Sequence, residues 1–177
     1  MFNYEAYIFL GFCCLQILAL YPSVNFVLNK NVKYRNYNMD RKLYIIKNVV
    51  KSIFLAYLSY TSTYLISDIY YDTWNKQRLN RFASLYVSND IMGLILIPKL
   101  PFSTKIHHIT TTLFLLYSYT LDFTEDNVGR LLVILCMFSS YSFLVNLYLG
   151  LRFLTDEQNN MLNYTIEKIR FWSYYIY

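Results

Sequence analysis

The chain has 177 residues, of which 56% are hydrophobic and only 15% are charged, whereas ordinary soluble domains carry roughly 25% charged residues. Its net charge of +5 comes from basic residues at the ends of apolar runs. Basic residues in this position set the orientation of membrane proteins. The composition therefore argues against an ordinary soluble domain and against a nucleic-acid partner.

Five uncharged runs follow one another along the chain once Asp90 is set aside. They cover 6–29, 52–67, 82–98, 106–121 and 131–151, and they contain 24, 16, 17, 16 and 21 residues. A membrane-spanning helix needs about 20 apolar residues. The first and fifth runs meet this length, and the second reaches it if Lys47 and Lys51 snorkel to the headgroups. We predict an all-α multi-pass membrane protein with about five transmembrane helices.

Two other architectures fit the pattern less well. A soluble helical bundle requires charged outer faces at a period of 3.6 residues, and 131–151 has no charge on any face. A transmembrane barrel requires strict alternation of apolar and polar residues over about ten positions, which the runs lack.

The basic residues also predict the organisation and orientation of the chain. They gather in 29–42, in 99–105 and after Arg152, whereas acidic residues dilute those in 68–81 and 122–130. The positive-inside rule then places the first group in the cytosol and the N-terminus in the lumen. We expect a first transmembrane helix and basic loop in 1–42 and a bundle core in 43–154. Residues 155–177 form a cytosolic or interfacial tail, or the start of a further span.

The third and fourth runs form a predicted hairpin. Pro98 and Pro101 flank Lys99-Leu100, and proline disrupts a continuing helix. We expect the fourth helix to begin with Ser103 or Thr104 as its N-cap.

Asp90 stands in the middle of the third run. A carboxylate at membrane depth is costly, so it faces a bundle interior or a wet cavity. One interpretation is a proton acceptor, or a carboxylate that orients a histidine. The other is a structural carboxylate that pairs with helix hydroxyls or a neighbouring amide, and Ser88 and Asn89 are near in sequence.

His107 and His108 are the only histidines, and they open the fourth run. Successive helical residues point about 100° apart, so the pair cannot form a metal site of the i, i+4 kind, and no metal or cofactor is predicted. Imidazoles that titrate near neutral pH suit general acid–base chemistry. The alternative is a polar helix start at the membrane interface.

Direct contact between Asp90 and the histidines is not guaranteed by the sequence. At 1.5 Å per residue, His107 lies about 6 Å from the start of its helix and Asp90 about 12 Å from the Pro98 end of the third. Contact therefore requires an axial offset between the helices, or a water. Thr111 and Thr112 follow one turn after the histidines and could bind them or a lipid.

The fifth run carries Asn146 and, one to two turns earlier, Ser139. An intramembrane asparagine usually joins helices by hydrogen bonding, and both residues are also candidates for lipid contact. The three cysteines lie in apolar runs without metal-ligand spacing and are expected to be free thiols.

These motifs together resemble the TLC (TRAM–Lag–CLN) domain family over about 44–154. The similarity rests on His107-His108-Ile-Thr-Thr-Thr, on Tyr86-x-x-x-Asp90, and on 138–147 followed by Arg152-Phe-Leu. The resemblance implies a lipid-handling bundle in the endoplasmic reticulum or another endomembrane. The family bundle has six or seven helices, and this chain would be a truncated version of it. The acids that ceramide synthases carry in the next helix have no counterpart in 132–143, so the chain is closer to the non-ceramide-synthase branches.

The function predicted from these features is binding or handling of a membrane lipid within the bundle, whether sphingolipid, phospholipid or fatty acyl. His107, His108 and Asp90 form the polar, candidate catalytic end. Thr111, Thr112, Asn146 and Ser139 are the candidate lipid contacts. The alternatives are an acyltransferase of ceramide-synthase type that uses acyl-CoA, an ion or solute transporter with Asp90 on the ion path, and a structural membrane scaffold.

Overall fold

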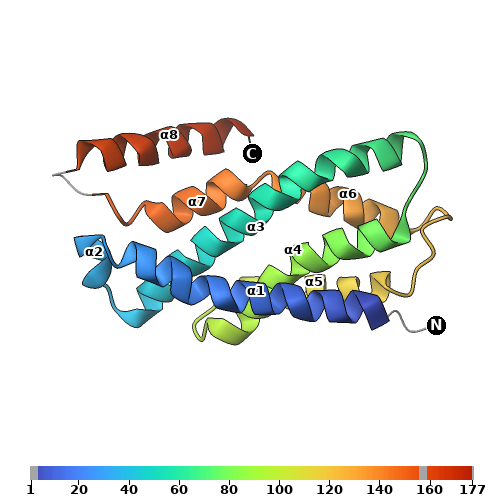
Figure 1. Ribbon diagram of the computed structural model, residues 1–177, viewed down its shortest axis with the longest axis horizontal. Helices are drawn as coiled ribbons and strands as arrows, with labels where there is room; N and C mark the ends of the chain where they lie inside the picture. The colour runs from blue at the N-terminus through green and yellow to red at the C-terminus, as the bar shows by residue number, and fades with distance from the viewer. Residues whose placement is uncertain (1–3, 156–158, 177) are drawn as a thin grey trace.

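The computed structural model describes residues 4–155 and 159–176, and this part of the chain consists of helices and their connections, without a strand. Figure 1 shows the helices running along the long axis of the molecule. Their bounds are α1 Tyr4–Leu28, α2 Val32–Arg35, α3 Met39–Tyr70, α4 Lys76–Leu96, α5 Phe102–Ser118, α6 Val128–Ser140, α7 Phe143–Leu151 and α8 Asn160–Ile176. The predicted all-α class is confirmed.

Asparagines start four of the helices. The side chains of Asn31, Asn38, Asn75 and Asn127 accept a hydrogen bond from a backbone N–H in the first turn of α2, α3, α4 and α6, which satisfies a donor that the helix leaves free. Helix α5 differs, because it begins at Phe102 with Pro101 in the cap position and no side-chain cap. The expected cap at Ser103 or Thr104 was therefore wrong. Proline is well placed there, since its fixed φ suits a helix start.

The fifth apolar run forms two helices instead of one. Helices α6 and α7 meet at an angle of 44° around Tyr141 and Ser142. The hydroxyl of Ser142 donates to the Ser139 carbonyl at 2.7 Å, and the Asn146 amide donates to the Ser142 carbonyl at 3.0 Å. Side chains that bond back to the helix carbonyls in this way bend helices.

Two described helices, α1 and α3, are long and apolar enough to cross a membrane. The bent pair of α6 and α7 makes a third if it is counted as one span. Helix α5, with 17 residues, is short, and α4 has Asn80, Asn89 and Asp90 buried along its length. The long apolar helices fit an integral membrane protein, and the two helices between them carry the polar groups.

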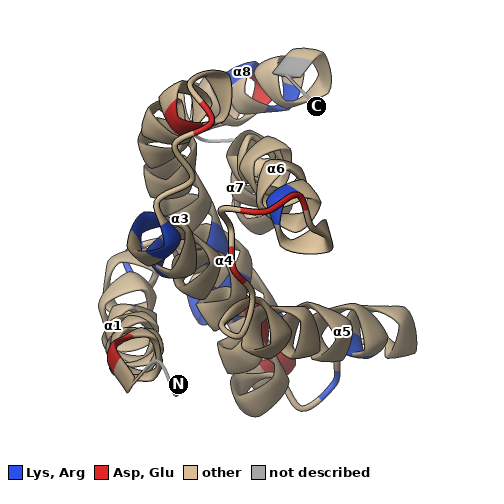
Figure 2. Ribbon diagram, turned by 90° about the vertical axis from the view of Figure 1, so that its right-hand side faces the viewer, with Lys and Arg blue, Asp and Glu red and all other residues tan. Residues whose placement is uncertain are grey.

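Helix α4 occupies the centre of the bundle. It packs against α1, α3, α5 and α6, and Figure 2 shows these helices around it when the molecule is seen end-on. Its buried face therefore meets several neighbouring helices at once. Any polar group on that face must find its partners on those helices.

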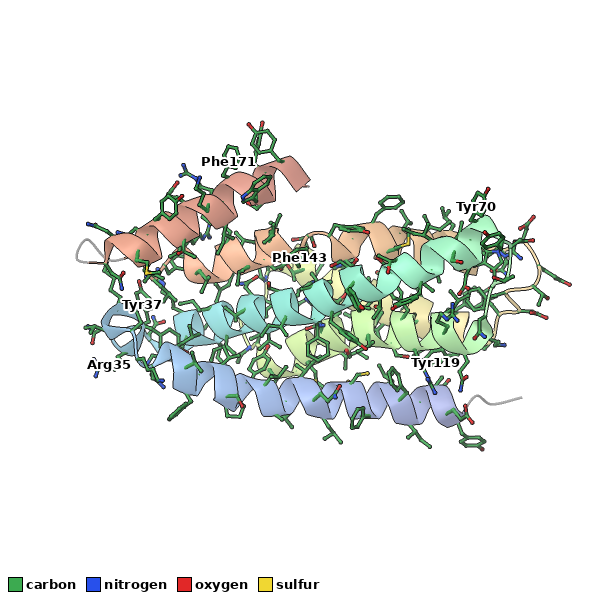
Figure 3. All side chains as sticks on the ribbon, turned by 45° about the horizontal axis from the view of Figure 1, so that its top comes forward. Arg35, Tyr37, Tyr70, Tyr119, Phe143 and Phe171 are labelled. Atoms are coloured by element: carbon green, nitrogen blue, oxygen red, sulfur yellow. The ribbon has the colours of Figure 1, made fainter. Side chains whose placement is uncertain are left out.

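The connections alternate between the two ends of the bundle. At one end, Tyr37 donates to the Phe153 carbonyl at 2.6 Å and Lys99 pairs with Asp40 at 2.6 Å. These contacts bring α2, the α4–α5 turn and the end of α7 together (Figure 1). Arg35 and Tyr37 lie at this end in Figure 3, and Tyr70 lies at the other. The three basic connections thus share one end, as the charge pattern predicted.

The opposite end is joined by its own polar contacts. Gln77 donates to Glu5 at 3.2 Å, and Arg130 lies 3.1 Å from Asp72 and stacks on the Trp74 ring at 4.7 Å. Helix α8 begins at the basic end and runs back beside α7, which it contacts. Its Phe171 side chain points away from the bundle in Figure 3.

Gly150 sets the close approach of α7 to α3. A Cβ at this position would lie 3.0 Å from Val49 Cγ2 and 3.2 Å from the Ile45 carbonyl oxygen. We expect Gly150→Ala to destabilise the protein by about 1–3 kcal/mol, as overpacking does. Thermal melting in detergent micelles would measure this. Gly11→Ala on α1 is the control, because a Cβ there meets nothing within 4 Å. Equal melting temperatures of the two variants would contradict the close packing of α7 on α3 at Gly150.

Candidate functional site

Asp90 lies at the centre of a cluster of polar side chains from three helices. It is 1% exposed on α4. Its Oδ1 atom lies 3.3 Å from Lys51 Nζ on α3 and 2.9 Å from His108 Nδ1 on α5. Its Oδ2 atom accepts a 2.8 Å hydrogen bond from Thr111 Oγ1 and lies 3.8 Å from His107 Nε2. A buried carboxylate is stable only when it is paired and hydrogen-bonded, and this cluster supplies both kinds of partner.

These contacts show which groups pair with Asp90. Ser88, the near neighbour on the same helix, donates instead to the Leu85 carbonyl at 2.8 Å. The recorded partners of the carboxylate all come from other helices. Asp90 therefore joins α3, α4 and α5. It lies against His108 and also accepts a hydrogen bond from the Thr111 hydroxyl, so the contacts contain elements of both interpretations.

The contact between Asp90 and His108 is direct. Helix α4 ends at Leu96, and 97–101 carry the chain to the start of α5 at Phe102. Five connecting residues allow α5 to be displaced along the bundle axis relative to α4. Of the two routes that the sequence left open, an axial offset or a bridging water, the 2.9 Å distance between His108 Nδ1 and Asp90 Oδ1 corresponds to direct contact.

The two histidines have different surroundings. The His108 side chain is 2% exposed, whereas that of His107 is 55% exposed. His108 packs closely on Gly93 of α4, where an added Cβ would lie 3.3 Å from His108 Nε2, a tight contact. Neither ring nitrogen of His108 makes a well-aligned hydrogen bond within the described residues, although Nδ1 is close to Asp90. Successive helical residues were expected to face different ways, and they do.

The two threonines contribute unequally. Thr111 donates to both Asp90 and the His108 carbonyl, and so belongs to the cluster. Thr112 donates at 2.7 Å to the His108 carbonyl within its own helix. Of the two candidate contacts, only Thr111 has a recorded hydrogen bond to the carboxylate.

Asn146 and Ser139 lie at the α6–α7 bend, away from these contacts. The amide of Asn146 bonds within its own helix, to the carbonyl and hydroxyl of Ser142. The carbonyl of Ser139 accepts from the Ser142 hydroxyl. The recorded hydrogen bonds of Asn146 shape α7 and do not join it to another helix.

Lys51 is the member of the cluster that sequence reasoning missed. It was expected to snorkel toward lipid headgroups, but its side chain is only 19% exposed and its ammonium pairs with Asp90. A lysine within an apolar helix is a signal for a buried carboxylate partner, because neither charge is stable there alone. Asp90 was the nearest candidate on another apolar run.

A cavity of about 350 Å³ opens at the basic end of the bundle, and its lining residues Lys47 and Thr104 lie one turn before Lys51 and His108 along their helices. It is formed by the start of α3 and by the α4–α5 turn, and Tyr44, Lys47, Asn48, Lys99 and Thr104 are among its lining residues. The hydrogen bond and charge of Asp40 raise the pKa of Lys99 above its ordinary value. The cavity lining therefore contains two lysines, of which Lys99 is paired with Asp40, set among apolar residues of α3 and the α4–α5 turn.

A second hollow is apolar and lies between α1, α3 and α4. This lateral groove has an open volume of about 620 Å³, and its walls include Phe12, Ala19, Ile53, Phe54 and Leu85. Ile53 and Phe54 follow Lys51 within one turn of α3. The groove therefore differs from the Asp90 cluster in character: its lining is mainly apolar, whereas the cluster is charged.

Comparison with known proteins returned no match: no family model, no curated protein and no solved structure matches the chain. The geometry of the cluster, the cavity and the groove therefore carries the functional argument.

Proposed function

We propose that the protein is an integral membrane protein of about five spans that binds a lipid in its helix bundle. The apolar character of α1, α3 and the α6–α7 pair supports membrane insertion. The basic connections at one end support a cytosolic location for that end and a lumenal N-terminus. The endoplasmic reticulum or another endomembrane is the compartment that the TLC resemblance implies.

The observation that carries lipid binding is an apolar groove whose wall on α3 begins within one turn of Lys51, a member of the buried charge cluster. The polar end of a lipid would bind near the Lys51–Asp90–His108 cluster and the cavity that Lys47 and Lys99 line. The acyl chain would bind in the groove. The proposal also extends to membership of the TLC family. The tyrosine–aspartate motif lies on α4 and the double-histidine motif on α5, and these two helices pack against each other.

Filling the groove tests the proposal. Ala19 lines it, so Ala19→Trp is expected to displace two to three methylenes of an acyl chain, each worth about 0.8 kcal/mol. Bound lipid should fall roughly ten- to fiftyfold. The measurement is mass spectrometry of the lipids that remain with the protein after extraction in detergent. Leu15→Trp is the matched control, because Leu15 is on the same helix, is 64% exposed and does not line the groove.

Equal lipid content in the Ala19→Trp and Leu15→Trp proteins would place the lipid outside the groove. Wild-type protein that retains only lipids in the proportions of the host membrane would count against lipid binding altogether.

Acyl transfer is a second candidate, favoured by the position of His107. Its ring is more than half exposed, and its Nε2 lies 3.8 Å from Asp90. An imidazole held near a carboxylate can take a proton from a lipid amine or hydroxyl while that group attacks an acyl-CoA thioester. The carboxylate stabilises the imidazolium, and the thiolate of coenzyme A leaves. Purified protein given acyl-CoA and sphingoid base would show N-acyl product if this candidate is correct.

A further inference from the structure

His107, His108 and Asp90 lie close enough together to be considered as metal ligands. One ligand atom from each of Asp90, His107 and His108 can be chosen so that all three lie within 4.8 Å of one another. Two imidazoles and one carboxylate are the protein ligands of several catalytic zinc sites, where water or substrate takes the fourth position. The sequence argument against a metal considered one helix only, whereas α4 supplies the carboxylate here.

The adjacent histidines converge because they present different nitrogens. His107 reaches Asp90 with Nε2, the far side of its ring, and His108 with Nδ1, the near side. Two ligand atoms of a tetrahedral zinc ion lie about 3.3–3.4 Å apart. The nitrogen–oxygen distances here are 3.8 Å for His107 and 2.9 Å for His108, one above and one below that value. The two distances end on different oxygens of the carboxylate, Oδ2 for His107 and Oδ1 for His108, so the carboxylate lies between the two nitrogens.

The surroundings of His108 give the strongest support for a metal ligand in this cluster. Its side chain is 2% exposed, and neither nitrogen makes a well-aligned hydrogen bond within the described residues. A buried polar atom without such a bond is destabilising. A metal at Nδ1 would satisfy the nitrogen that faces Asp90. Thr111, which donates to Asp90 Oδ2 at 2.8 Å, is a partner of the kind that orients ligating carboxylates.

We propose that Asp90, His107 and His108 bind one divalent transition-metal ion, of which zinc best suits two imidazoles and a carboxylate. Lys51 is the competing cation. Its ammonium lies 3.3 Å from the same Asp90 oxygen that faces His108, so the metal and Lys51 exclude each other there. Metal binding moves the Lys51 ammonium away from Asp90. This site does not depend on lipid binding, because its ligands come from the chain alone.

The test is equilibrium binding of Zn²⁺ to the full chain in detergent micelles. The protein is stripped with chelator and purified with a tag that contains no histidine, because the chain has only His107 and His108. One ion per chain is expected. His108→Ala and Asp90→Asn should each raise the dissociation constant by at least about tenfold. Loss of a residue that only hydrogen-bonds to a metal ligand already costs about that much affinity. Co²⁺ in place of Zn²⁺ should give the visible absorption of a tetrahedral site.

Lys51→Met separates a metal site from a permanent ion pair. Removing the competing cation is expected to tighten Zn²⁺ binding and to make the variant more strongly stabilised by Zn²⁺ in thermal melts than wild type. The control is the double variant Cys13→Ser/Cys14→Ser, which removes the only adjacent thiols and should bind Zn²⁺ as wild type does. Two results would overturn the proposal: no bound ion at micromolar free Zn²⁺, or binding that survives His108→Ala and Asp90→Asn unchanged. Because the readout contains no lipid, a failure here leaves the test of the groove unaffected.

Discussion

Asp90→Leu is expected to destabilise the folded bundle by about 3–5 kcal/mol, because it leaves the Lys51 ammonium in a largely buried position without its counter-charge. The Lys51 side chain is 19% exposed and pairs with an aspartate that is 1% exposed. Membrane insertion of each helix should be unaffected, since leucine only makes α4 more apolar. The loss should therefore appear in unfolding of the inserted protein, measured by denaturant titration in micelles.

The double variant Asp90→Leu/Lys51→Met is the matched control. It removes both charges and leaves two apolar side chains of similar size, so most of the lost stability should return. A buried pair replaced in this way is often neutral or stabilising. If the two single variants and the double variant instead show additive losses, Lys51 and Asp90 do not interact in the folded protein.

His108→Ala and His107→Ala are expected to differ strongly. His108 is almost fully buried against Gly93 and Asp90, so truncation leaves a cavity and removes a partner of a buried carboxylate. We expect a loss of about 2–4 kcal/mol of folding stability. His107 is more than half exposed, and its truncation should change stability by less than about 0.5 kcal/mol.

The same pair of variants separates a binding site from an enzyme. If His107 is a general base, His107→Ala should lower the rate of acyl transfer by about 10²–10⁴ while the protein remains folded and bound lipid is retained. If the protein only binds lipid, neither variant has a turnover to lose. Comparable melting temperatures for the two variants would contradict the different burial of the two rings.

Several features of this protein follow from the sequence alone. Segregated charges and long apolar runs are sufficient to predict helices, because each run must satisfy its backbone groups internally if it lies in lipid. Pro98 and Pro101 separate α4 from α5, where the hairpin was expected. The basic residues of 29–42, 99–105 and the region after Arg152 predict a shared end, and the structure has it. Burial of Asp90 follows from the cost of its charge.

Other features needed the tertiary structure. The bend between α6 and α7 depends on which hydroxyls bond back to their own helix, and serine gives no strong local signal for this choice. The pairing of Asp90 with Lys51 and His108 depends on the axial offset of three helices, and spacing along one helix contains no information about that offset. For the same reason, the sequence predicted a pair of histidines with acid–base character, and only the packing of α4 against α5 placed a carboxylate within ligand distance of both.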